Sequence, residues 1–149
     1  MPNTTIANPT RQTGAKVQPH QNVPTHRRET ARVLLVEDEQ VTAEVFARAL
    51  QRRGHEVRVA KDGMQALHAL RDFEPDVVVL DLGLPTVPGI EVLRKLRQSH
   101  EDKIPVVIVS GAGEGAVPSA GELMEPGRWL EKPLRPRDLV QAVDEVTAK

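Results

Sequence analysis

The chain has 149 residues, of which 39% are hydrophobic and 28% charged, a composition typical of one soluble globular domain with a short extension. A net charge of −1 gives no electrostatic argument for binding nucleic acid or an anionic membrane. No apolar run approaches the roughly 18 residues that a bilayer-spanning helix needs. The chain lacks cysteine, which excludes disulfides and thiolate metal sites and fits a cytoplasmic location.

Residues 1–30 differ in composition from the remainder. They contain four prolines among Asn, Thr, Gln and His, and their apolar residues follow no period. Such a segment buries too little apolar surface to offset its ordering entropy, so we expect a disordered tail over residues 1–30 and one domain over residues 31–149. The tail holds four basic residues and one acidic residue, which leaves a net charge of −4 on the domain. A docking arm, a transit peptide, a mis-assigned start and a plain solvated tail stay open as explanations.

The rest of the chain alternates β-rich apolar runs with helical periodicity. Strands are predicted at residues 32–36, 57–59, 77–80, 106–109 and 128–131. The helix after the first strand closes at Gly54, and its apolar stripe comprises Val41, Val45, Ala49 and Leu50. Further helices are predicted from residue 63 to before residue 75, at about 90–98, within 117–125, and at about 136–147. This alternation predicts an α/β fold, a doubly wound five-stranded parallel sheet with helices on both faces.

Polar residues follow four of these strands at the point where each strand ends. They are Glu37 with Asp38, then Asp81, Ser110 and Lys132. Because the carboxyl ends of parallel strands meet at one edge of the sheet, we expect these side chains to share a crevice. Each close pair of carboxylates costs about 3–4 kcal/mol at an effective dielectric constant of about 20, and one lysine neutralises only one charge. An all-oxygen site of this kind suits a hard divalent ion such as Mg²⁺, with Mn²⁺ as a substitute.

Each of these residues taken alone also has a structural explanation. An acidic pair such as Glu37 and Asp38 is favoured at a helix N-terminus, and an aspartate such as Asp81 often starts a turn. Ser110 alone could be an ordinary hydroxyl at a strand end, and Lys132 alone could be an ordinary surface lysine. The five histidines, at positions 20, 26, 55, 68 and 100, show no ligand spacing and are interpreted as surface residues.

Taken together, four short motifs resemble the receiver domain of two-component response regulators. The motifs are Val36-Glu37-Asp38-Glu39, Asp81-Leu82-Gly83-Leu84-Pro85 with Gly89, Val109-Ser110-Gly111, and Lys132-Pro133-Leu134. The resemblance covers residues 32 to 148. It implies a flavodoxin-like (βα)5 fold with strand order 2-1-3-4-5.

The resemblance also implies a phosphoryl-transfer site. Asp81 would accept a phosphoryl group from the phosphohistidine of a histidine kinase or a histidine phosphotransfer protein. Mg²⁺ would be bound by Asp38 and Asp81, by Glu37 through water, and by the backbone carbonyl of Gly83. Lys132 would stabilise charge on the phosphoryl oxygens, so that catalysis is mostly positioning and electrostatics.

The resemblance further implies a switch. Ser110 would bond to the phosphorylated aspartate, and Trp129 occupies the position of a rotating aromatic residue that is usually Tyr or Phe. The bond before Pro133 would be cis. The Gly- and Pro-rich stretch 111–128 departs from the family pattern, with Glu125-Pro126 where Gly-Ala is common, which suggests a mobile fourth helix.

We therefore expect a phosphorylation-switched module that catalyses only its own phosphorylation and dephosphorylation. Because the sequence stops soon after the last predicted helix, a stand-alone regulator that acts on an unknown protein target is expected, without nucleic acid or membrane as a partner. The alternative is a receiver-like docking module that no longer switches. A true phosphohydrolase is disfavoured because Gly83, and not a second aspartate, stands two residues after Asp81.

Overall fold

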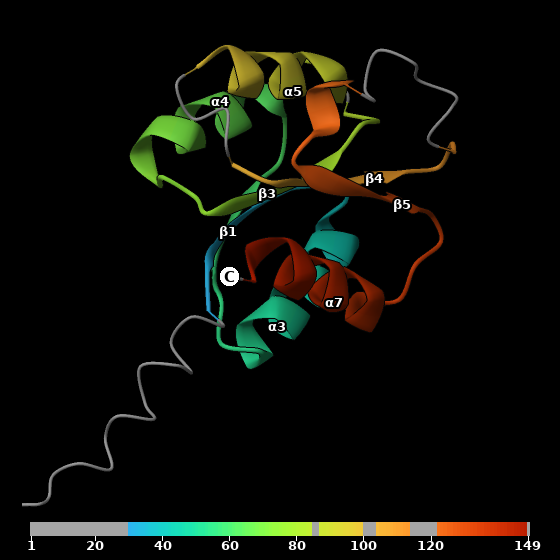
Figure 1. Cartoon of the computed structure of the whole chain (residues 1–149). Helices are drawn as coiled ribbons and strands as arrows, with labels where there is room; N and C mark the ends of the chain where they lie inside the picture. Colours follow the sequence, from blue (N-terminus) through green and yellow to red (C-terminus); the bar gives the residue numbers. More distant parts are fainter. Residues whose placement is uncertain (1–29, 85–86, 100–103, 114–121, 149) are drawn as a thin grey trace, which may run out of the picture.

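The computed structural model describes residues 30–84, 87–99, 104–113 and 122–148 (Figure 1). Two of the sequence predictions fall outside these ranges. They are the disordered tail, of which only residue 30 is described, and most of the fourth helix, of which residues 122–124 are described as a helical turn. The proposal of a mobile fourth helix therefore stays a prediction.

The fold is built on one five-stranded parallel sheet. Its strands are β1 (Arg32–Val36), β2 (Glu56–Ala60), β3 (Val77–Asp81), β4 (Val106–Ser110) and β5 (Gly127–Glu131). Their order across the sheet is β2-β1-β3-β4-β5, which confirms the predicted doubly wound topology. All five residues of β3 and of β4 are buried, as expected of central strands that are covered on both faces.

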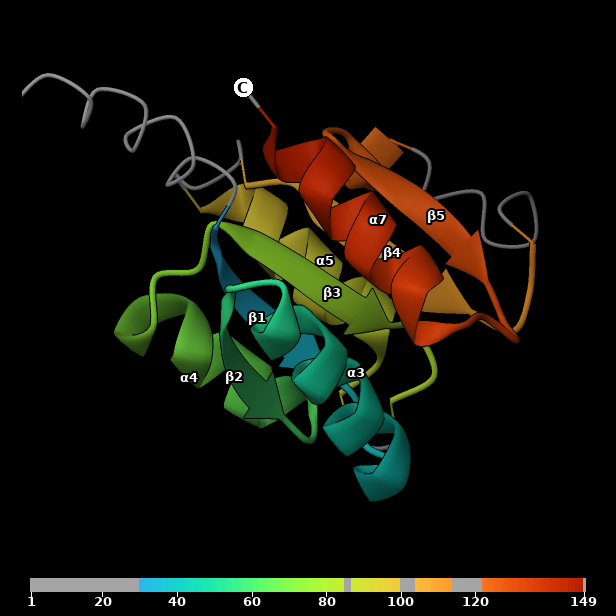
Figure 2. The same cartoon turned by 90° about the horizontal axis from the view of Figure 1, so that it is seen from below.

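Among the described residues, helices cover both faces of the sheet (Figures 1 and 2). One pair is α3 (Gln40–Arg52) and α7 (Pro136–Thr147), and the other is α4 (Gly63–Asp72) and α5 (Gly89–Gln98). Alternate strand residues point to opposite faces, so that Leu34 and Leu80 pack toward α4 and α5 while Val33 and Leu35 pack toward α3 and α7. None of the helices in the described part of the chain is long and apolar enough to cross a membrane.

The buried face of α3 differs from the predicted stripe. The residues that pack against the sheet are Ala43, Phe46, Ala47 and Leu50, whereas Val41 is 64% exposed and Val45 is 46% exposed. Both stripes have helical spacing, but the stripe with Phe46 carries the larger apolar side chain and is the one that packs against the sheet. The interpretation of Val41 and Val45 as core residues is therefore wrong, and the two valines form an exposed apolar face.

His55 is a second correction, because it is buried and not on the surface. It follows Gly54, whose φ of 105° suits only glycine, and it is 4% exposed. Its Nδ1 accepts the backbone N–H of Ala31 at 3.0 Å, and its Nε2 lies 2.9 Å from a carboxylate oxygen of Asp144. His55 therefore joins the start of β1 to α7. His68 is exposed as predicted, and the other three histidines lie outside the described residues.

Candidate functional site

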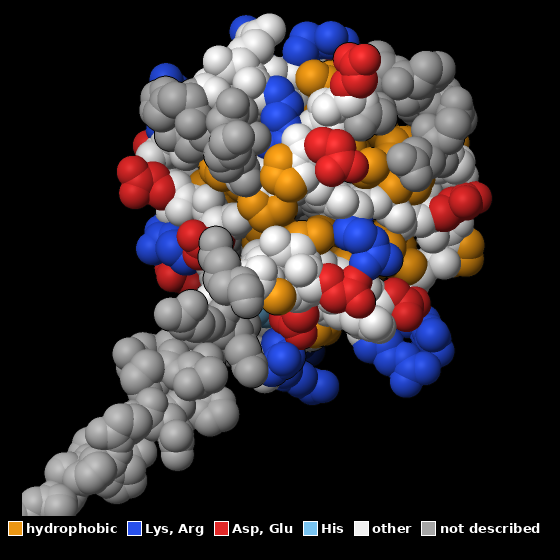
Figure 3. Space-filling view, in the orientation of Figure 1, with side chains coloured by type: hydrophobic (Ala, Val, Ile, Leu, Met, Phe, Trp, Pro, Cys, Tyr) orange, Lys and Arg blue, Asp and Glu red, His pale blue; other side chains and the backbone are white. Residues whose placement is uncertain are grey.

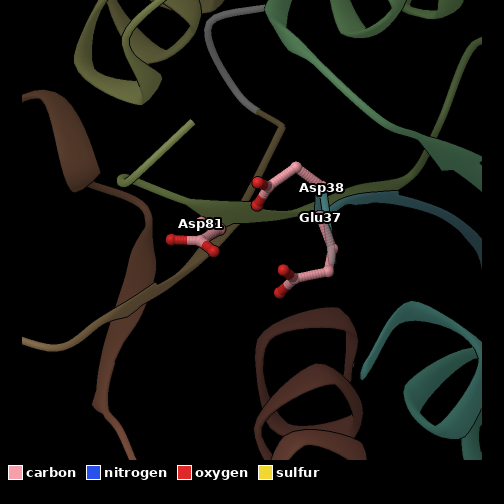
Figure 4. Close-up of side chains that lie close together, drawn as sticks. All are labelled: Glu37, Asp38 and Asp81. Carbon is pink, nitrogen blue, oxygen red and sulfur yellow. The ribbon is translucent and has the colours of Figure 1, made fainter. Parts of the chain in front are cut away.

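Three carboxylates meet where β1 and β3 end (Figure 4). The two strands are adjacent and in register, with Val36 opposite Leu80, so Glu37 and Asp38 come to lie beside Asp81. Each of the three residues offers an oxygen within 4.8 Å of the others. Glu37 and Asp81 are buried and Asp38 is exposed, so the cluster opens to solvent on one side.

Two hydrogen bonds fix the orientation of the Asp81 carboxylate. Its Oδ1 accepts the backbone N–H of Gly83 at 2.8 Å, and its Oδ2 accepts from the ammonium of Lys132 at 3.0 Å. Gly83 belongs to the loop after β3, and Lys132 follows β5, the edge strand two strands away from β3. The Lys132–Pro133 peptide bond is cis, and so is the Glu125–Pro126 bond, which the sequence did not lead us to expect.

The pKa values of Glu37 and Lys132 report the excess of negative charge. Burial raises the pKa of Glu37, and the nearby charges of Asp81 and Asp38 raise it further, although the Glu39 backbone N–H and Lys132 act in the opposite direction. Burial by itself would lower the pKa of Lys132. The hydrogen bond to Asp81 and the charges of the three carboxylates outweigh burial, so the pKa of Lys132 is raised.

This donor set fits a hard divalent cation. Among the described residues, Lys132 is the one cation that bonds to any of the three carboxylates. Its single positive charge leaves the cluster with an excess of negative charge when all three acids are ionised. Oxygen ligands that include one or two carboxylates and leave room for water are the ligands that Mg²⁺ prefers.

Replacing Glu37 by glutamine is expected to stabilise the metal-free protein. A carboxyl whose pKa is raised in the folded state contributes stability below its unfolded pKa, and that contribution is lost as the pH rises through the folded pKa. At pH 7 the variant should therefore have a free energy of unfolding higher by about 1 kcal/mol, and the gain should disappear below about pH 4.

Urea denaturation in the presence of a chelator, over a series of pH values, measures this difference. The exposed Glu44 on α3 supplies the control, because Glu44→Gln should change the stability by less than about 0.5 kcal/mol. A Glu37→Gln protein that is less stable than the wild type at pH 7 would contradict the charge argument.

Ser110, the last residue of β4, and Trp129, in the middle of β5, both bond to Ala112. The hydroxyl of Ser110 accepts the backbone N–H of Ala112 at 3.1 Å, and the indole N–H of Trp129 donates to the carbonyl of Ala112 at 3.2 Å. The carbonyl of Ser110 accepts the backbone N–H of Lys132 at 2.7 Å. The described start of the loop after β4 is thus tied both to the aromatic ring and to the strand end that carries Lys132. Whether these residues switch stays a prediction.

Gly89 permits α5 to begin directly against the Asp81 loop. A Cβ at this position would lie 2.7 Å from the carbonyl oxygen of Asp81 and 2.6 Å from the Cα of Leu82, distances that no larger residue tolerates. The sequence motif included Gly89, but the contact with the backbone of Asp81 became visible only in the folded chain. Its effect is to join the N-terminus of α5 to the phosphoacceptor candidate.

Comparison with known proteins places this geometry in a family. A family model described as the response regulator receiver domain matches residues 33–144, about three quarters of the chain. The chain belongs to the response regulator receiver family. This confirms the resemblance drawn from the four motifs and makes the protein a component of two-component, phosphorelay signal transduction.

The curated relatives include longer proteins. The chain is 35% identical over 112 residues to the DNA-binding response regulator MtrA of Mycobacterium tuberculosis (strain ATCC 25618 / H37Rv), which covers 75% of this chain and 48% of MtrA. It is 32% identical over 109 residues to the response regulator MprA of Mycobacterium sp. (strain KMS), covering 73% of this chain and 47% of MprA. The chain therefore spans about half the length of the curated relatives that it matches.

Solved receiver structures share the fold. The receiver domain of the Francisella response regulator 1452 has a TM-score of 0.72 and 25% identity, covering 78% of this chain and 96% of that one. The chemotaxis response regulator CheY4 of Vibrio cholerae has a TM-score of 0.72 and 27% identity, covering 78% and 98%. NtrX from Brucella abortus has a TM-score of 0.71 and 30% identity, covering 79% of this chain and 27% of NtrX.

The relatives overturn the expectation that nucleic acid is excluded as a partner. MtrA is a DNA-binding response regulator, so regulators with a closely similar receiver do act on DNA. The exclusion rested on net charge, and the face shown in Figure 3 indeed carries acidic and basic side chains side by side. The expectation failed because the matched part is only about half of MtrA, and the charge of that part does not determine what the whole regulator binds. The expectation of a stand-alone regulator stays a prediction.

Proposed function

We propose that the protein accepts a phosphoryl group on Asp81 from the phosphohistidine of a histidine kinase or histidine phosphotransfer protein, and that it hydrolyses the product itself. The observation that supports this proposal is the buried Asp81 carboxylate, held by Gly83 and Lys132 within 4.8 Å of two further acids. In the forward step a carboxylate oxygen attacks phosphorus, an O–P bond forms, and the N–P bond to the imidazole breaks.

The chain's own residues position and stabilise this reaction. The Gly83 N–H and the Lys132 ammonium hold the two carboxylate oxygens, so the nucleophile has little freedom to rotate. Lys132 also offers a cation to the transferring phosphoryl oxygens. Glu37, Asp38, Asp81 and the Gly83 carbonyl are the proposed ligands of Mg²⁺, which when bound supplies positive charge for the phosphoryl group.

Mass spectrometry tests the reaction directly. After incubation with Mg²⁺ and a small phosphodonor, the wild-type chain should gain one phosphoryl group, and it should lose the group again after the donor is removed. A chelator should prevent the gain. A chain that stays unlabelled at saturating Mg²⁺ and donor would contradict the proposed function.

The exposed face of α3 is where a protein donor would contact the chain. A phosphohistidine must reach Asp81, so its carrier has to cover the surface around the site. A hollow lined by Thr42, Phe46 and Lys132 lies between α3 and the segment after β5. The exposed Val41 and Val45 each stand one residue before Thr42 and Phe46 on the same helix. Apolar side chains at such a position favour a protein partner over a small-molecule donor alone.

Replacing Val45 by aspartate should separate the two kinds of donor. We expect the rate of phosphotransfer from a histidine phosphotransfer protein or kinase to fall about tenfold or more, because a charge would be buried in that contact. Labelling by a small phosphodonor should be unchanged. Met64 on α4 is 51% exposed on the other side of the sheet, so Met64→Asp is the matched control. Transfer from the protein donor at the wild-type rate in Val45→Asp would show that Val45 does not contact the partner.

A further inference from the structure

Arg97 makes an unusual set of hydrogen bonds near the end of α5. Its Nε donates to the carbonyl of Leu123 at 2.6 Å, and one terminal nitrogen donates to the carbonyl of Ile104 at 2.6 Å. The other terminal nitrogen donates to the carbonyls of Met124 at 3.1 Å and Pro126 at 3.0 Å. Four backbone carbonyls therefore converge on one half-buried guanidinium.

These carbonyls belong to the segments that lead into two strands. Ile104 precedes β4, and residues 123–126 lead directly into β5, which carries Trp129 and ends next to Lys132. The carbonyl of Pro126 also accepts the backbone N–H of Val106 at 3.0 Å, so the entry to β5 is fixed to β4 as well. A planar guanidinium with several donors suits this arrangement better than the point charge of a lysine.

The other end of α5 touches the phosphorylation site. Gly89 lies against the backbone of Asp81 and Leu82 so closely that a Cβ would clash. Between the two ends, Val92, Leu93 and Leu96 are buried against the sheet, which holds the helix as one rigid element. The turn before β5 lies on the same side of the sheet as α5 (Figure 1). The helix thus connects the Asp81 loop to the entry of β5.

We infer that Arg97 is a positioning residue of the phosphorylation response. Arg97 bonds residues 123–126, which lead into β5, to α5. A change in the position of the loop after Asp81 therefore shifts these residues as well. This route is separate from the one through Ser110 and Trp129, which starts at the end of β4. The inference rests on the proposed function, since it requires Asp81 to be the group that is modified.

Hydrogen exchange with and without Mg²⁺ and beryllofluoride tests the inference, because beryllofluoride mimics a phosphoryl group on a carboxylate. In the wild type, the ligand should change the exchange rate in the peptide that covers residues 122–128. In Arg97→Met, exchange there should be about 10- to 100-fold faster without ligand, and the ligand-dependent change should be lost. The fluorescence of Trp129, the only tryptophan, should still respond to the ligand.

Arg94 provides a matched control on the same helix. Its guanidinium lies 3.5 Å from Glu91 in a surface pair, so Arg94→Met should behave as the wild type does. If Arg97→Met does not fold, Arg97→Lys keeps the charge and part of the bonding, and its ligand-dependent change should be reduced. A full change in either Arg97 variant would overturn the inference.

The outcomes also separate the inference from the proposed function. A wild type that responds at residues 80–84 but not at 122–128 overturns the inference alone. A wild type that does not respond to beryllofluoride anywhere overturns the proposed function and the inference with it.

Discussion

Asp81→Asn is expected to abolish phosphorylation, with a loss of labelling rate of at least about 10³-fold. The carboxamide has one oxygen, so it keeps an acceptor for either the Gly83 N–H or Lys132, which in the wild type bond to different oxygens of Asp81. It carries no negative charge and is a poor nucleophile. The fold should survive, because the variant removes one of three mutually repelling acids. Its free energy of unfolding should stay within about 1 kcal/mol of the wild-type value.

Mass spectrometry after incubation with Mg²⁺ and a small phosphodonor measures the effect, and beryllofluoride titration followed by Trp129 fluorescence measures it independently. Asp72 on α4 is exposed and distant from the site, so Asp72→Asn supplies the control and should be labelled like the wild type. Labelling of Asp81→Asn at the wild-type rate would place the phosphoryl acceptor on another residue.

The centre of the sheet could be predicted from the sequence because its central strands are short and almost purely apolar. The runs at 77–80 and 106–109 have no polar residue, which in an alternating α/β pattern leaves only a central, doubly covered strand as the explanation. The ends of the helices followed from punctuation such as Gly54 and Pro75. What failed was the choice between two stripes on α3, because helical spacing alone does not say which stripe meets the sheet.

The convergence of the site could be predicted for a different reason. In a parallel sheet, the residue that follows each strand has only one edge to occupy, so Glu37, Asp38 and Asp81 had to approach one another once the strand order was known. The bonds of Arg97 and His55 could not be predicted in this way. Both side chains reach backbone groups or carboxylates that are far away in the sequence, and no local pattern marks such a partner.

The two sets of residues differ in how firmly the fold holds them. Groups that converge because of the sheet are held by strand register, which is rigid. Groups such as Arg97 and Trp129 are held by side-chain hydrogen bonds to loop carbonyls, and each of these bonds breaks at a cost of about 1–3 kcal/mol. From the proposed phosphorylation of Asp81 we expect a shift in bonds of that strength, and no shift in the register of the strands. The parts expected to respond are therefore the ones that sequence patterns describe least well.

Lys132→Gln is expected to slow phosphorylation by about 10²- to 10³-fold, because it removes a cation that contacts Asp81 and that stabilises the transferring phosphoryl oxygens. The pKa of Lys132 is raised above 10.5, the ordinary pKa of a lysine, so the ammonium stays charged to a higher pH than usual. In the wild type, deprotonation of Lys132 should therefore not lower the phosphorylation rate at any pH up to about 10. In the variant, no change of pH should restore the wild-type rate.

Rates of labelling by a small phosphodonor, measured at several pH values, test this expectation. Lys61→Gln is the control, since Lys61 is exposed after β2 and should leave the rate unchanged. A thermal melt of each variant separates loss of chemistry from loss of fold. Lys132→Gln should be labelled slowly but to completion, since Asp81 is intact. A wild-type rate in a folded Lys132→Gln protein would mean that its cation takes no part in phosphoryl transfer and serves only to balance the charge of Asp81.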